Sequence, residues 1–143
     1  MLNEQDIFNA HILIVDDIKT NVLLLEQMLS EAGYQNFTST MDPCAVVELD
    51  RANHFDLILL DLQMPAMDGF QVMEALKISR VNDGPYILVI SVKIEQKLRS
   101  LAAGAKDFIA KPFKIAEIAS RIRTLLEANS LMKQRKISMP ARQ

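Results

Sequence analysis

The sequence is poor in several residue types, and the scarcity of cysteine is the most informative. Cys44 is the only cysteine, and tryptophan is absent. A single thiol can form neither an internal disulfide nor a cysteine metal cluster, which is typical of proteins in a reducing compartment. We expect Cys44 to be a small buried hydrophobe on a helix that begins near Asp42.

Long apolar runs are also missing. No stretch reaches the roughly 20 apolar residues that a membrane-spanning helix needs. Residues 1–10 are mixed and polar, without the basic-then-apolar pattern of a secretion signal. The sequence therefore predicts a soluble, cytoplasmic protein with no membrane contact.

An excess of positive charge is missing as well. The formal net charge is −2 over 143 residues, so nothing global indicates direct binding to nucleic acid. Residues 129–143 carry four basic side chains and no acid, which leaves the rest of the chain more acidic. Half of the residues are hydrophobic, enough for the core of one domain of ordinary size.

Two short apolar runs end in carboxylates. Residues 11–15 lead into Asp16 and Asp17, and residues 57–60 lead into Asp61. Continuous apolar runs of this length, ended by polar or turn residues, are typical of buried parallel strands. In open parallel sheets, ligand sites form just beyond the carboxyl ends of the strands. We therefore expect these three acids to share one edge of a sheet.

Strand-like and helix-like segments alternate along the chain, with short loops between them. The predicted strands are residues 11–16, 35–40, 56–60, 86–90 and 106–109. The predicted helices cover residues 19–32, 42–53, 69–80 and 94–103, and a fifth begins near residue 114. A turn is predicted at residues 82–85. This alternation predicts an α/β fold, a flavodoxin-like (βα)5 three-layer sandwich around a parallel sheet in the order 2-1-3-4-5.

In that strand order, four strands present polar side chains around one crevice. They are Asp16 with Asp17, then Asp61, Ser91 and Lys111. Three carboxylates at one rim repel one another, and a divalent cation is the simplest compensation. Oxygen ligands favour Mg²⁺ or a similar hard ion. A carboxylate nucleophile, Mg²⁺, a lysine and a hydroxyl together can accept a phosphoryl group.

Four separated segments carry a family resemblance. Ile12–Asp17, Leu60–Gly69, Ile90–Ser91 and Gly104–Phe113 resemble the receiver domain of two-component response regulators. The resemblance covers about residues 10–127. It implies a phosphorelay signalling switch that is a phosphoprotein and not an enzyme, beyond its own phosphorylation and dephosphorylation.

The resemblance also implies residue roles. Asp61 would accept the phosphoryl group from a phosphohistidine of a sensor histidine kinase or phosphotransfer protein. Asp16, Asp17, Asp61 and the backbone carbonyl of Gln63 would hold Mg²⁺. Lys111 would pair with the phosphoryl group, and a cis Lys111–Pro112 bond is expected.

Two further residues would carry the switch. Ser91 would hydrogen-bond the phosphoryl oxygen and draw its loop inward, and Phe108 occupies the aromatic switch position. The output surface would be the fourth helix, fifth strand and fifth helix of the predicted order. Ser91 stands where the family often has threonine, and it keeps the hydroxyl. Gln63 differs from the more frequent Asn, Arg or Met at a position that tunes dephosphorylation.

Three other functions use similar parts. A Mg²⁺-dependent phosphohydrolase with an aspartyl nucleophile usually needs a second acid two residues later, where this chain has Gln63. A flavodoxin-type flavin module would need a phosphate-binding loop after the first strand, where acidic residues stand instead. A pseudo-receiver used only for docking would not need the complete set of phosphoacceptor-site residues, which is the three acids, the serine and the lysine.

The two ends of the chain are predicted separately. We expect residues 1–9 to be an N-terminal extension, 10–127 the receiver domain, and 128–143 a helical extension that ends in a disordered tail. The fifth helix continues the spacing of Ile115, Ile118, Ile122 and Leu125 through Asn129, Met132 and Lys136, a fading heptad with a polar seam position. It is either a solvated helical extension or a linker toward an output domain or a second protomer.

Overall fold

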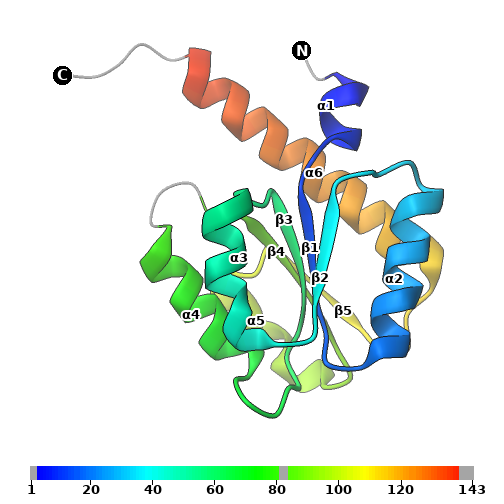
Figure 1. The fold of residues 1–143 in the computed structure, drawn as a ribbon, viewed down its shortest axis with the longest axis vertical. Helices are drawn as coiled ribbons and strands as arrows, with labels where there is room; N and C mark the ends of the chain where they lie inside the picture. Colours follow the sequence, from blue (N-terminus) through cyan, green and yellow to red (C-terminus); the bar gives the residue numbers. More distant parts are fainter. Residues whose placement is uncertain (1–2, 81–83, 139–143) are drawn as a thin grey trace.

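The computed structural model describes residues 3–80 and 84–138, with side chains described as far as Lys133. Within these residues the chain forms a five-stranded parallel sheet in the order β2-β1-β3-β4-β5 (Figure 1). The predicted flavodoxin-like order is confirmed. The strands are β1 (Ile12–Val15), β2 (Phe37–Thr40), β3 (Leu57–Asp61), β4 (Tyr86–Ser91) and β5 (Asp107–Ala110).

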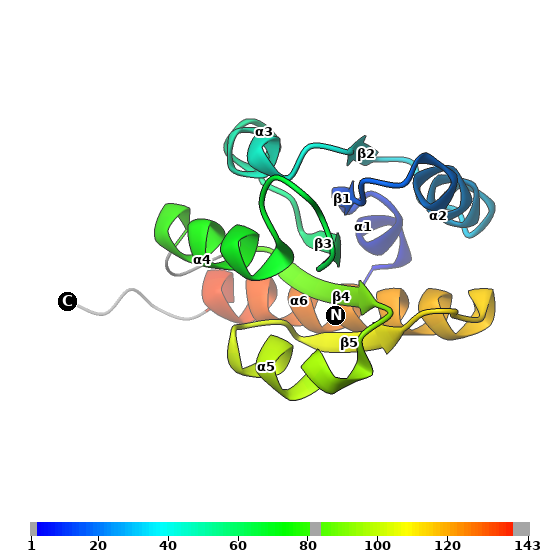
Figure 2. The same ribbon diagram turned by 90° about the horizontal axis from the view of Figure 1, so that it is seen from below.

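Helices cover both faces of the sheet, so the predicted three-layer sandwich is confirmed. Side chains of α2 and α6 pack on one face, and those of α3 and α4 on the other, where α5 also lies (Figure 2). The helical segments are α1 (Glu4–Phe8), α2 (Lys19–Glu31), η1 (Pro43–Ala45), α3 (Val46–Asn53), α4 (Gly69–Ser79), η2 (Ile94–Gln96), α5 (Lys97–Ala102) and α6 (Ile115–Ser138).

The central strands are apolar on both faces because both faces are covered. In β3, Leu57 and Leu59 pack toward α2 and α6, whereas Ile58 and Leu60 pack toward α3 and α4. All five residues of β3 are buried. A shift of β3 by one residue would exchange the side chains on its two faces. Burial on both faces and the polar residues at the strand ends therefore fix its pairing register with the neighbouring strands. The edge strand β2 is polar and only half-buried.

The prediction that Cys44 is buried is wrong, because Cys44 is exposed. Asp42 does cap this segment, since its side chain accepts a hydrogen bond from the Cys44 N–H at 2.9 Å. The segment begins as a tight 3-10 turn, and that turn directs Pro43 and Val46 into the core. Cys44 lies between them on the outer side.

A short helix, α1, forms within the predicted N-terminal extension. Asn3 caps it by accepting a hydrogen bond from the Gln5 N–H at 2.9 Å. Ile7 is buried against the α2 and α6 side of the core, and the ring of Phe8 lies 5.5 Å from that of Tyr34. A helix of five residues has little intrinsic stability. These tertiary contacts therefore hold it in place.

Among the described helices, even the 24-residue α6 is too polar to cross a bilayer. The predicted turn at residues 82–85 lies partly outside the described residues. The predicted disordered end, residues 138–143, lies outside them except for Ser138, which is the last residue of α6.

Candidate functional site

Three carboxylates meet at the carboxyl edge of the sheet. The pairing of Val15 with Leu60 places the residues that follow them, Asp16 and Asp61, on adjacent strands. Asp16, Asp17 and Asp61 each offer one oxygen, and these oxygens lie within 4.8 Å of one another. Asp16 and Asp61 are only 2% and 5% exposed. The predicted convergence of the three acids is therefore present in the fold.

Asp16 is held firmly by hydrogen bonds. Its Oδ1 accepts from the Ile18 N–H at 2.9 Å. Its Oδ2 accepts from the Lys111 ammonium at 3.1 Å and from the Asn21 amide at 3.3 Å. The first bond closes the turn into α2, and the other two fix the direction of the carboxylate.

Asp17 contrasts with its neighbour. Its Oδ1 is buried and has no hydrogen-bond partner among the described residues. A buried carboxylate oxygen without a partner is unfavourable unless a cation or water satisfies it. The three converging oxygens and this orphaned atom together fit a hard divalent cation.

Burial perturbs the Asp61 carboxyl. Its pKa is raised to about 6, mainly by desolvation and to a smaller extent by the nearby charges of Asp16 and Asp17. Lys111, whose ammonium lies 3.8 Å from Asp61 Oδ1, lowers the pKa, as does the hydrogen bond that Oδ1 accepts from the Gln63 N–H at 3.2 Å. The negative form of Asp61 therefore depends on the positive charge that faces it.

Lys111 reaches this edge from the loop after β5. Its backbone N–H donates to the Ser91 carbonyl at 2.8 Å, which joins the ends of β4 and β5. The Lys111–Pro112 peptide bond is cis, as predicted. The ammonium then lies between Asp16 and Asp61 and is largely shielded from water.

Ser91 and Phe108 lie where the sequence predicts. Ser91 is fully buried at the end of β4, one residue beyond the Ile90 that pairs with Asp61. Its hydroxyl oxygen accepts a hydrogen bond from the Lys93 N–H at 3.1 Å. Phe108 is 6% exposed on the β5 face that carries the α4 core. The aromatic side chain thus faces inward in this structure.

Close packing behind the acids requires a glycine. A Cβ on Gly69 would meet Leu62 Cδ2 at 2.5 Å, Leu62 Cα at 2.9 Å and the Asp61 carbonyl oxygen at 3.0 Å. Asp68 caps α4 in a capping box with Gln71, whose N–H donates to the Asp68 side chain at 3.0 Å. The start of α4 therefore packs directly on the end of the acid-bearing strand.

Several residues at the mouth of the site were not predicted from the sequence. A hollow of about 450 Å³ lies beside the acids, and its walls include Asp17, Gln63 and the cationic Lys93 and Arg99. The Arg99 guanidinium stacks 3.7 Å above the centre of the Phe70 ring, a favourable cation–π contact. Arg99 belongs to no motif, and only the fold brings it here.

Gln63 spans the same mouth. Its side-chain amide donates to the Gln96 side chain at 3.2 Å, across the gap between the β3–α4 loop and η2. Asn21, which bonds Asp16, and Gln96 were also missed, because neither lies in a recognisable pattern. By contrast, His11 and His54 lie exposed and away from the carboxylate cluster.

Relatives share both the sequence pattern and the fold. Residues 12–123 match the family described as the response regulator receiver domain. The transcriptional regulatory protein YvrH of Bacillus subtilis is 37% identical over 120 residues, which are 83% of this chain and 50% of YvrH. The response regulator PleD of Caulobacter vibrioides is 36% identical over 119 residues, or 82% of this chain and 26% of PleD. The chain thus spans half or less of these relatives.

A solved structure with a bound cation is also similar. It is the receiver domain of the sensor histidine kinase PA1611 from Pseudomonas aeruginosa, with magnesium coordinated in its active-site cleft. It has 28% identity and a TM-score of 0.74, covering 83% of this chain and 98% of that one. The family match and the converging carboxylates lead to the same conclusion: this chain belongs to the response regulator receiver domains of two-component systems.

Proposed function

We propose that Asp61 is the phosphoacceptor of this receiver domain and that Mg²⁺ is needed for the transfer. The observation that carries the proposal is the cluster of Asp16, Asp17 and Asp61 with the Lys111 ammonium among them. Asp61 is the last residue of the central strand β3. Of the three acids it is the one in line with the strand end, close to both Lys111 and the Gln63 N–H.

The residues that would hold Mg²⁺ are Asp16, Asp17, Asp61 and the backbone carbonyl of Gln63. The partnerless Asp17 oxygen supports this set, because a cation would satisfy it. When bound, Mg²⁺ supplies positive charge that offsets the charge on the transferring phosphoryl oxygens. A magnesium-bearing relative supports the choice of ion.

The transfer step is then a displacement at phosphorus. An Asp61 carboxylate oxygen forms the new O–P bond, the N–P bond of the donor phosphohistidine breaks, and the imidazole nitrogen keeps the bonding electron pair and takes up a proton. Lys111 pairs with the phosphoryl oxygens, and the Ser91 hydroxyl donates to one of them. A sensor histidine kinase or a phosphotransfer protein is the proposed donor.

The switch would be read on the surface formed by α5, β5 and α6, with Ser91 and Phe108 as the moving residues. Apolar side chains around η2 and α5 are unusually exposed there: Val92 at 62%, Ile94 at 65% and Leu98 at 80%. Such a patch is suited to a protein partner. The proposed partner is an output domain or a second copy of the chain, with residues 10–127 as the receiver and 128–143 as the linker.

A phosphohydrolase is less well supported. The position two residues after Asp61 holds Gln63, whose amide cannot transfer protons and instead hydrogen-bonds Gln96. Receiver domains act as phosphoacceptor switches, and the proposal places this chain among them without a substrate turnover of its own.

The test is incubation with Mg²⁺ and acetyl phosphate, followed by intact-protein mass spectrometry. We expect one added phosphoryl group in the wild type, none without Mg²⁺, and none in Asp61→Asn. Addition that persists in Asp61→Asn would move the acceptor to another residue. Steady release of phosphate without a lasting adduct would favour the hydrolase.

A further inference from the structure

Asp56 joins three elements at the amino edge of the sheet, opposite the acidic site. It exchanges hydrogen bonds with His11: the Asp56 N–H donates to the His11 carbonyl, and the His11 N–H donates to Asp56 Oδ2, both at 2.8 Å. The Asp56 carbonyl accepts from the Tyr86 N–H at 3.0 Å and from the Asn129 amide at 2.7 Å. Its Oδ1 forms an ion pair with Lys133. One residue thus links β1, β4 and the far part of α6.

The Asn129 side chain continues the buried face of α6. Asn129 is 7% exposed and follows the buried Ile118, Ile122 and Leu125 on the same side of the helix. The polar seam position of the fading heptad is therefore occupied within this chain. Of the predicted seam positions, Ile115 and Met132 are 45% and 42% exposed, so the buried face extends only from Ile118 to Asn129. Leu131 is 47% exposed as well.

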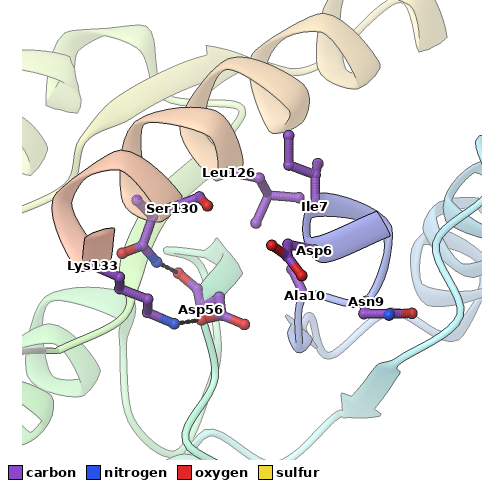
Figure 3. Close-up of a pocket in the computed structure, with 9 residues that line it drawn as sticks. Asp6, Ile7, Asn9, Ala10, Asp56, Leu126, Ser130 and Lys133 are labelled. Atoms are coloured by element: carbon purple, nitrogen blue, oxygen red, sulfur yellow. Dashed lines mark hydrogen bonds and ion pairs between the residues drawn. The ribbon is translucent and has the colours of Figure 1, made fainter. Parts of the chain in front are cut away.

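A second element holds α6 from the other side. Glu4 of α1 forms an ion pair with Arg123 of α6, and the Arg123 guanidinium lies 5.5 Å from the centre of the Phe8 ring. Between α1 and the Asp56 contacts lies a hollow of about 270 Å³, with Ile7 and Leu126 among its walls. Figure 3 shows Lys133 reaching from α6 to Asp56, with α1 across the hollow.

We propose that Asp56, Asn129 and Lys133 form a clasp that makes the exit portion of α6, residues 127–138, a rigid arm of the domain. A segment attached after residue 138 would then have a fixed orientation relative to the domain, which a flexible linker would not give. Asp56 is the positioning residue of this arm. It holds the arm through a buried amide bond and a charge pair, while the amino ends of β1 and β4 fix Asp56 itself.

Hydrogen exchange tests the arm directly, without Mg²⁺ or a phosphodonor. Asn129→Leu keeps the side-chain volume but removes the bond to Asp56, and Lys133→Gln removes the ion pair. In the double variant we expect amides of residues 130–138 to exchange about tenfold faster, since one lost hydrogen bond and ion pair change the opening equilibrium by about that factor. Lys97→Gln, at an exposed lysine on α5, is the charge-matched control and should leave these amides unchanged.

A distance measurement separates loss of the arm from loss of the fold. The exposed Cys44 and a cysteine introduced by Met132→Cys accept spin labels at two surface sites. We expect a narrow distance distribution in the otherwise wild-type chain and a broad one in the double variant, with core amides of β3 still protected. A broad distribution without the clasp substitutions, or unchanged exchange with them, would overturn the proposal. Because no phosphoryl chemistry is involved, either result is independent of whether Asp61 is the acceptor.

Discussion

Asp56 immediately precedes the fully buried strand β3, and Asp61 is the last residue of that strand. The two side chains make their contacts at opposite edges of the sheet. Asp56 binds the start of β1 and the exit portion of α6, whereas Asp61 faces Lys111 and the other acids. Asp61 lies five positions after Asp56 along extended chain, a span of about 16 Å. The central strand therefore connects the acidic site to the helix that leaves the domain.

Asp17 is expected to be a ligand of the bound cation. Asp17→Asn keeps the shape but removes a charged ligand whose Oδ1 has no other described partner. We expect Mg²⁺ affinity to fall by at least about tenfold, measured by isothermal titration calorimetry. Glu31→Gln, which removes an exposed carboxylate at the end of α2 that lies away from the cluster, is the control. Equal affinities for wild type and Asp17→Asn would remove Asp17 from the metal site.

The Asp61 carboxyl should make stability depend on pH in a particular direction. Its pKa is about 6 in the folded, metal-free protein and 3.8 as the ordinary value. The folded state therefore binds more protons between these values, and the free energy of unfolding falls as pH rises from about 4 to 6. The contribution is on the order of 2–3 kcal/mol. Urea denaturation with EDTA, comparing wild type with Asp61→Asn across this range, measures it. We expect the free energy of unfolding of the wild type minus that of Asp61→Asn to fall over this range. If this difference stays constant or rises with pH, the assignment is contradicted.

Lys111 should matter more for the state of Asp61 than for the fold. Lys111→Met removes the positive charge that lowers the Asp61 pKa, so we expect that pKa to rise above about 6. Carbon-13 NMR of labelled aspartate follows the titration in the metal-free protein. We also expect the variant to accept a phosphoryl group in part, without the accompanying change in the α5 surface. Full activation of Lys111→Met by beryllofluoride, seen as wild-type shifts in α5 amides, would refute its role in the switch.

Gly69 should not tolerate a larger side chain. Gly69→Ala places a Cβ 2.5 and 2.9 Å from Leu62 atoms, distances that real Cβ atoms do not adopt, and 3.0 Å from the Asp61 carbonyl oxygen. The start of α4 must then move, and we expect a loss of about 1–3 kcal/mol in the free energy of unfolding. Chemical denaturation measures the loss, and Asp68→Asn, which keeps a capping side chain, serves as the neighbouring control. Unchanged stability and unchanged Mg²⁺ affinity would show that the loop adapts freely.

The sequence by itself determined the fold class and the acidic site. Apolar runs that end in Asp16 and Asp61 can be strands of one parallel sheet only if their polar ends meet at the same edge. Helix spacing and glycine stops then place the crossovers. Both signals are local, because side-chain period and strand ends are properties of neighbouring residues. That is why Lys111, Ser91 and the three acids could be named from the sequence.

Only the tertiary structure decided what the ends of the chain do. In the sequence, Asn129 is only a polar residue at a seam position of a weak heptad pattern. In the structure its side-chain amide donates a hydrogen bond to the carbonyl of Asp56, 73 positions away. The five residues of α1 carry too little helical signal to stand out, and contacts with Arg123 and Tyr34 hold them in place. Cys44 faces outward because a single 3-10 turn rotates it away from Val46. The outcomes at Asn129 and α1 depend on which distant surface is available for packing, and no local pattern in a sequence encodes that.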